Sequence, residues 1–147
     1  MKEIIGLILL CMVSISAHAD NEALYERLDS VVANRAAYTK KKEVYIDKIK
    51  KAIPHTTNTN MRLQLYEEIY NEYHYLRFDS AMVYVRKGLE IAEAAHNDYY
   101  TQLFILHKAA LFSSAGLYSE AYNLLDKLDD RPILPALAYE YNLTLYW

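Results

Sequence analysis

The stretch "RFDSAMVYVRKGLEIAEAA", residues 77–95, has apolar residues at the spacing of one helix face. A second stretch, "LYSEAYNLLDKLDD" at residues 117–130, follows the same rhythm. When the two are superimposed, Ala81 falls on Ala121 and Phe78 falls on Tyr118. A helix pattern that recurs at a fixed interval predicts an array of similar helical units.

Composition favours an all-α chain. The 147 residues include only three glycines and three prolines, which disfavours a turn-dense β-sandwich. Apolar residues make up 53% and charged residues 24%, so the chain has the composition of a folded domain. The net charge of −3 gives no electrostatic signal for nucleic-acid binding by this segment.

Residues 1–19 are predicted to be a secretory signal peptide. They contain Lys2, an apolar core at residues 4–13 and the triplet Ala17-His18-Ala19, so cleavage is expected after Ala19. We therefore expect export to the periplasmic side of the inner membrane. An uncleaved anchor is less favoured, because a span needs roughly 20 apolar residues. Lipidation of Cys11 is also less favoured, because Cys11 lies inside the apolar core.

Residues 20–53 are predicted to form an N-terminal helical segment that ends at Pro54. Whether it is one helix or two helices broken near residues 37–40 stays open. Its basic run at residues 39–43 is interpreted as a solvated face. The spacing of its stripe alternates between three and four residues. The apolar members of the stripe are Leu24, Leu28, Val31, Tyr38, Tyr45 and Ile49, with Arg35 and Lys42 between them.

The helical repeats are predicted over residues 60–147, as repeat 1 (60–97), repeat 2 (98–130) and the first helix of a further repeat (133–147). Asp79 is predicted to be an N-cap, and Asn97 is predicted to end its helix in a left-handed conformation. Gly116 is placed in a turn. The last pattern reaches Trp147 without a polar cap, so we expect the array to be truncated at its C-terminus and to belong to a longer protein.

These repeats resemble the tetratricopeptide repeat (TPR), a helix–turn–helix unit of about 34 residues. Ala81 and Ala121 match the small residue that opens its second helix, and Gly116 matches its turn glycine. The resemblance implies an all-α, antiparallel helix-hairpin solenoid, in which Ala81 and Gly88 are points of close helix approach. A generic array of amphipathic helices is the alternative, because Ile69, Leu76 and Leu128 depart from the TPR pattern.

A second resemblance concerns the order of segments along the chain. The signal peptide, the helix "ALYERLDSVVANRAAYTKKKEVYIDKIK" at residues 23–50 and the repeats are similar to the exported front of bacterial TPR-containing transcriptional regulators. This resemblance implies a membrane span and a DNA-binding region beyond residue 147. It implies that the segment itself is the extracytoplasmic sensing part of a membrane-anchored regulator.

TPR proteins line a partner-binding groove mainly with the first helix of each unit. The groove lacks a basic clamp for a terminal carboxylate, so we expect another kind of protein or peptide ligand. The alternative is that its tyrosines pack against the helix at residues 21–53. By resemblance, the groove positions are Leu63, Tyr66, Tyr70, Tyr73, His74, Leu103, Leu106, Ala110, Ser113 and Ser114.

No catalytic constellation is found in the sequence. His55, His74, His96 and His107 have neither HExxH spacing nor cysteine pairs beside them, so no metal site and no cofactor is expected. We therefore predict a non-enzymatic protein- or peptide-binding module that can associate with itself through its last helix. A cell-envelope scaffold without a signalling role is the main alternative. A hydrolase whose sites lie further along the chain is a third hypothesis.

Overall fold

A computed structural model describes residues 22–129 and 132–146 of the chain. The predicted signal peptide lies outside the described residues. The chain divides into two compact units, Met1–Glu43 and Val44–Trp147, which we describe separately.

The first unit is helical over residues 22–33 and, after a turn at Asn34, includes the first part of α2 (Arg35–Ala52). The part of α2 from Val44 onward belongs to the second unit. The Nδ2 atom of Asn34 donates a hydrogen bond to the Ser30 carbonyl oxygen at 2.8 Å. Asparagine side chains compete in this way with regular helix hydrogen bonding. The interruption therefore lies at Asn34, before the residues 37–40 that the sequence indicated. After α2, a short 3-10 helix η1 (Ile53–His55) contains Pro54.

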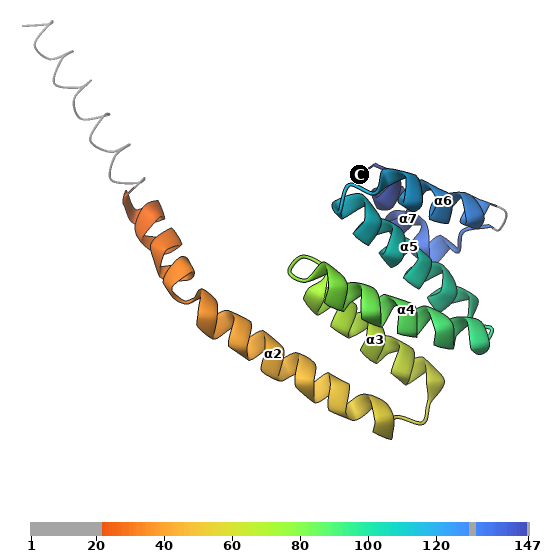
Figure 1. The fold of residues 1–147 in the computed structure, drawn as a ribbon, viewed down its shortest axis with the longest axis horizontal. Coiled ribbons are helices and arrows are strands. Elements are labelled where there is room, and N and C mark those ends of the chain that lie inside the picture. The colour runs from red at the N-terminus through yellow and green to blue at the C-terminus, as the bar shows by residue number, and fades with distance from the viewer. Residues whose placement is uncertain (1–21, 130–131, 147) are drawn as a thin grey trace, which may run out of the picture. The chain divides into compact units, whose positions relative to one another are not determined.

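The second unit is an array of helices that pack on their neighbours in chain order (Figure 1). Helix α3 (Thr59–Tyr73) pairs with α4 (Phe78–Ala94), and α5 (Asp98–Ser114) pairs with α6 (Tyr118–Asp129). The 3-10 helix η2 (Pro135–Leu137) leads into α7 (Ala138–Leu145), which packs on α5. This architecture confirms the all-α, TPR-like fold class.

Two predicted caps are wrong. Helix α4 begins at Phe78 with Arg77 at the N-cap position and no side-chain cap, so Asp79 lies inside the first turn. There its charge still favours the positive end of the helix dipole. The left-handed residue after α4 is His96, with φ 50°, and Asn97 instead caps α5 by accepting a hydrogen bond from the Tyr100 amide at 3.1 Å. Gly116 is left-handed, with φ 76°, as a turn glycine requires.

Small residues bring α4 close to its neighbours. Ala81 and Gly88 are buried on α4, and Phe104 of α5 is fully buried. A Cβ atom added to Gly88 would lie only 2.6 Å from Cε2 of Phe104. The absence of a side chain at Gly88 therefore makes room for the Phe104 ring at the crossing of α4 and α5.

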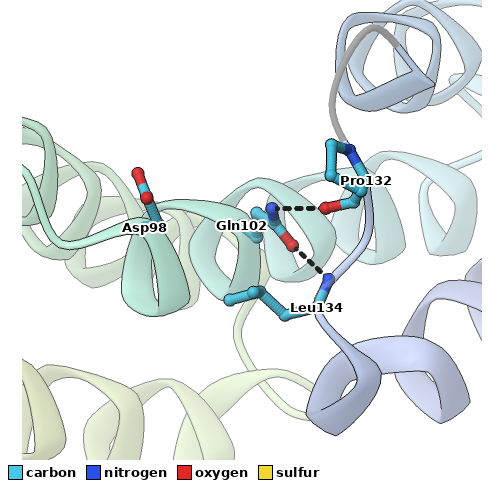
Figure 2. Close-up of a pocket in the computed structure, with 4 residues that line it drawn as sticks. All are labelled: Asp98, Gln102, Pro132 and Leu134. Carbon is cyan, nitrogen blue, oxygen red and sulfur yellow. Dashed lines mark hydrogen bonds between the residues drawn. The ribbon is translucent and has the colours of Figure 1, made fainter.

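Gln102 fixes the connection between α6 and α7. Its buried side chain donates from Nε2 to the Pro132 carbonyl at 3.3 Å and accepts from the Leu134 amide through Oε1 at 3.0 Å (Figure 2). One amide thus satisfies both a backbone acceptor and a backbone donor of the connecting segment. This pair of bonds holds the segment against α5, just before η2 and α7.

Candidate functional site

Most of the predicted groove residues lie in the hydrophobic core. Six of the ten are buried, and the other four, His74, Ala110, Ser113 and Ser114, are partly or fully exposed. The structure places these six side chains in the core of the described residues and not on an exposed surface. These six residues are Leu63, Tyr66, Tyr70, Tyr73, Leu103 and Leu106.

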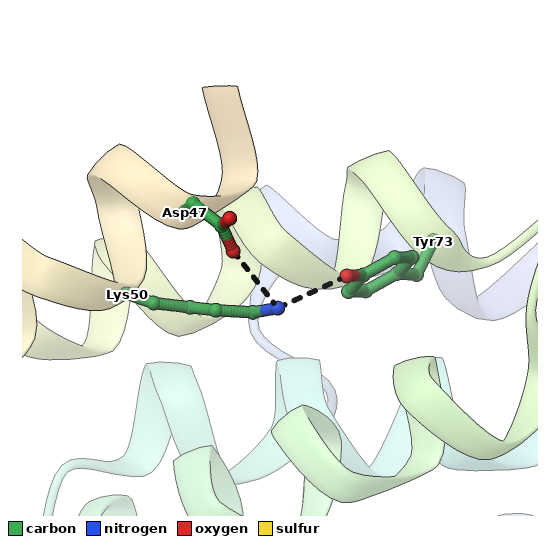
Figure 3. A network of polar contacts seen from close by, with 3 residues as sticks. All are labelled: Asp47, Lys50 and Tyr73. Carbon is green, nitrogen blue, oxygen red and sulfur yellow. Dashed lines mark hydrogen bonds and ion pairs between the residues drawn. The ribbon is translucent and has the colours of Figure 1, made fainter. Parts of the chain in front are cut away.

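The C-terminal part of α2 accounts for some of this burial. Ile46 and Ile49 of α2 join the same hydrophobic core as the α3 tyrosines. Lys50 donates a hydrogen bond to the Tyr73 hydroxyl at 3.1 Å and lies 3.6 Å from Asp47 (Figure 3). The tyrosines of α3 thus pack within the fold, which is the alternative that the sequence left open.

Polar and aromatic contacts join α3 and α5 along their length. Near the helix starts, Asn97 donates from Nδ2 to Oδ1 of Asn60 at 2.9 Å. Further along, the ring of Tyr70 stacks on that of His107, with 3.9 Å between centroids. Residues early in α3 thus meet residues early in α5, and later residues meet later ones. The two helices therefore run side by side in the same direction, as the first helices of successive TPR units do.

One end of this contact is acidic. The side chain of Glu67 on α3 is half-buried, and burial together with the negative charge of Glu140 on α7 raises its pKa. The pKa of Tyr99 on α5 is also raised, by burial and by both carboxylates. Residues from three helices therefore share one electrostatic environment, in which a cationic group would be favoured.

The other end carries imidazole rings. Tyr70 stacks on both His74 and His107, and His74 also lies against the exposed Tyr75. The Nε2 atom of His107 is enclosed without a hydrogen-bond partner. Burial, and then the nearby His74, lower the pKa of His107 to about 3. His107 is therefore neutral at physiological pH and acts as an aromatic packing group.

We call the surface that includes both the acidic end and the imidazole end the α3/α5/α7 face. It keeps His74 from the predicted groove and adds Glu67, Tyr99, His107 and Glu140, which sequence reasoning missed. No motif marks these four residues, because each acquires its neighbours only when the helices pack. The sequence also does not indicate which of the adjacent Glu67 and Glu68 belongs to this face. Glu68 instead contacts the Tyr45 hydroxyl.

The described residues hold no group of three or more metal-ligating side chains. Among the helices of residues 22–129 and 132–146, none combines the length and hydropathy needed to cross a bilayer. The face offers the His74 ring, the Tyr99 phenol and two carboxylates that are exposed or half-buried, so it is suited to holding a ligand through hydrogen bonds, ring stacking and charge.

Comparison with known families identifies the fold. The family model described as the SusR N-terminal TPR domain matches residues 32–147. The chain belongs to this family. No curated protein and no solved structure matches the chain, so the assignment rests on the family model. As a SusR-type TPR domain, the chain is a helical protein-interaction module, and it resembles SusR-like regulators as the sequence predicted.

We expect His107 to make this TPR domain sensitive to acid. The folded chain keeps His107 neutral down to pH about 3, whereas an unfolded imidazole binds a proton below about pH 6.5. The unfolded state therefore binds more protons between these values, and stability falls as the pH falls. This contribution amounts to at most about 1.4 kcal/mol per pH unit.

Urea unfolding at pH 4, 5, 6 and 7 measures the effect. His107→Phe keeps a stacking ring but cannot bind the proton, so its stability should decline less steeply than that of the parent below pH 6.5. His55→Phe, at an exposed position, is the matched control and should follow the parent. If His107→Phe and the parent decline in parallel, then His107 is not held neutral by the fold.

Proposed function

We propose that this TPR domain is the extracytoplasmic sensing part of a membrane-anchored bacterial regulator. In this proposal it binds a protein or peptide without catalysing a reaction. The match to the SusR N-terminal TPR domain over residues 32–147 is the observation that carries the proposal. A membrane span and a DNA-binding region would then follow in the gene, and the sequence downstream of codon 147 tests that part directly.

The proposed contact surface is the α3/α5/α7 face. Its acidic end, with Glu67 and Glu140, favours a lysine or arginine side chain of the partner. Tyr99 is 39% exposed beside the two carboxylates, so its ring can pack on the aliphatic part of such a side chain. A partner segment with a basic residue next to apolar ones fits this combination.

A stability measurement tests whether the acidic end is strained in the free domain. The pKa of Glu67 is raised, so folding is favoured when Glu67 is protonated, and this stability is lost as the pH rises through the pKa of the folded state. Glu67→Gln should therefore raise the melting temperature at pH 7, and the gain should shrink towards pH 4. Binding sites often sacrifice stability in this way.

Glu90→Gln on α4 is the matched control, because Glu90 is exposed and lies on a different helix. It should leave the melting temperature close to that of the parent at both pH values. A fall in melting temperature for Glu67→Gln at pH 7 would mean that the carboxylate has a stabilising partner.

Export is tested by expressing the chain with its own first residues in a Gram-negative host. The periplasmic fraction should contain a product whose intact mass corresponds to cleavage after Ala19. A full-length product in the cytoplasm would contradict the predicted signal peptide.

Regulation is tested separately, by transcript profiling of a strain that lacks the gene. The proposal predicts a defined set of transcripts that change in the deletion strain and return to normal on complementation. An unchanged profile together with an altered cell envelope would favour the scaffold alternative.

A further inference from the structure

An apolar stripe on the N-terminal unit is exposed to solvent. Leu24, Leu28 and Val31 share one face of the helix at residues 22–33, and Tyr38 continues the same spacing beyond the turn at Asn34. All four are 57–61% exposed, although apolar side chains with this spacing are usually buried. Tyr25 and Val32 widen the exposed surface. We call these six residues the N-terminal stripe. Helices in proteins gain most of their stability from packing an apolar face, so the stripe calls for a partner.

The spacing of the stripe indicates the shape of that partner. The spacing between successive stripe positions alternates between three and four residues, and this average spacing of 3.5 residues is typical of a helix that packs against another helix. Leu24, Arg27, Leu28 and Val31 line a surface depression between them. Such a depression is the kind of hole into which a side chain of a facing helix inserts.

The charges around the stripe indicate the chemistry of that partner. Arg27 lines the depression, and Arg35 occupies the next position of the same spacing. The acids of this helix, Glu22, Glu26 and Asp29, fall on its opposite side at 100° per residue. A parallel second copy would place Arg35, which occupies a seam position, against its own counterpart, and this pairing of like charges is unfavourable. An acidic helix would complement them.

We propose that the N-terminal stripe binds an amphipathic helix of another protein, whose apolar seam is flanked by aspartate or glutamate. This interaction surface shares no residue with the α3/α5/α7 face and goes beyond the proposed sensing function. It gives the chain a second site, one that recognises a helix.

Two designed four-heptad peptides test the proposal on the purified full chain. Both have leucine at the seam positions, and they differ only in having glutamate or lysine at the flanking positions. The glutamate peptide should bind, and its affinity should fall as salt is added. The lysine peptide should not bind. Equal binding of both peptides, or binding of neither, would overturn the proposal.

Variants locate the contact. Leu28→Ser should weaken binding of the glutamate peptide by roughly tenfold or more, because it removes one buried leucine from the interface. The double variant Arg27→Glu/Arg35→Glu should reverse the preference and bind the lysine peptide. Glu26→Lys, on the opposite side of the helix, is the matched control and should bind as the parent does. Unchanged preference in the double variant would contradict the charge argument.

Two other possible occupants of the stripe, a second copy of the chain and a membrane surface, are tested with the same purified protein. Sedimentation that shows a dimer, dissociated by Leu28→Ser, would mean that a second copy covers the stripe. Binding of the parent but not Leu28→Ser to vesicles with anionic lipid, without binding of the glutamate peptide, would mean that the stripe meets a membrane surface. Either result would overturn the proposal, and neither would affect the tests at Glu67 and Glu140.

Discussion

Gly88→Val is expected to lower the free energy of unfolding by about 3 kcal/mol, because it adds side-chain volume to a filled helix crossing. A Cβ atom at this position would already lie 2.6 Å from Cε2 of Phe104, and Phe104 is fully buried. The ring therefore has little room to move away. Gly88→Ala should cost less, since the gain in helix propensity of about 1 kcal/mol opposes the overlap.

Thermal and urea unfolding measure this cost. Ala94→Val, at an exposed position near the end of the same helix, is the matched control and should change stability by less than about 1 kcal/mol. Phe104→Leu shortens the opposing side chain, so the double variant Gly88→Ala/Phe104→Leu should be more stable than the sum of the single effects predicts. If Gly88→Val unfolds like the parent, α4 and α5 do not approach each other at this point.

Gln102→Met is expected to lower the free energy of unfolding by about 2–3 kcal/mol. The substitution keeps the length of the side chain but removes both bonds to the connecting segment, to the Pro132 carbonyl and from the Leu134 amide. A buried backbone group that loses its partner costs about 1–3 kcal/mol, beyond the modest net value of each bond. Leu137 and α7, which follow this segment, should loosen with it.

Hydrogen exchange of the Leu134 amide reports directly on this contact and should become faster in Gln102→Met. Glu90→Met is the matched control: Glu90 is exposed on α4 and its side chain has the same length as glutamine, so its replacement should change stability by about 0.5 kcal/mol or less. Unchanged exchange at Leu134 would show that the Gln102 side chain does not hold the segment.

Much of the fold could be predicted because it depends on local patterns. The repeat of helix pairs follows from apolar spacing, and the match of Ala81 to Ala121 indicated where the second helix of each unit begins. The TPR resemblance indicated Gly88 as a point of close approach, and the overlap with Phe104 explains why a small residue is needed there.

Helix ends were harder to predict. Asn97 stands between two helices, where an asparagine can either end the first or cap the second, and the sequence does not distinguish these roles. Its Oδ1 atom caps α5, and His96 takes the left-handed conformation instead. Asp79 was predicted to be the N-cap but lies two residues after it, because aspartate is favourable both at the N-cap and in the first turn.

The site was the least predictable part, since it depends on which helix covers which face. Family positions placed Tyr66, Tyr70 and Tyr73 in a groove, but a helical stripe does not say which neighbour will pack on it. Here they are buried with Ile46 and Ile49 of α2 in one core. Glu67 and Glu140 are far apart in sequence, and only the packing of three helices brings their charges together.

The central claim is that the α3/α5/α7 face binds a protein or peptide partner. Its most direct test starts with peptides selected from a random display library on the purified chain. Their dissociation constants are then measured for the parent, for Glu67→Gln/Glu140→Gln and for the control Glu90→Gln. We predict basic peptides that bind the double variant at least about tenfold more weakly, because charge-assisted bonds are lost, and that bind Glu90→Gln as they bind the parent. Equal affinity for all three proteins, or a library that yields no binding peptide, would contradict the account.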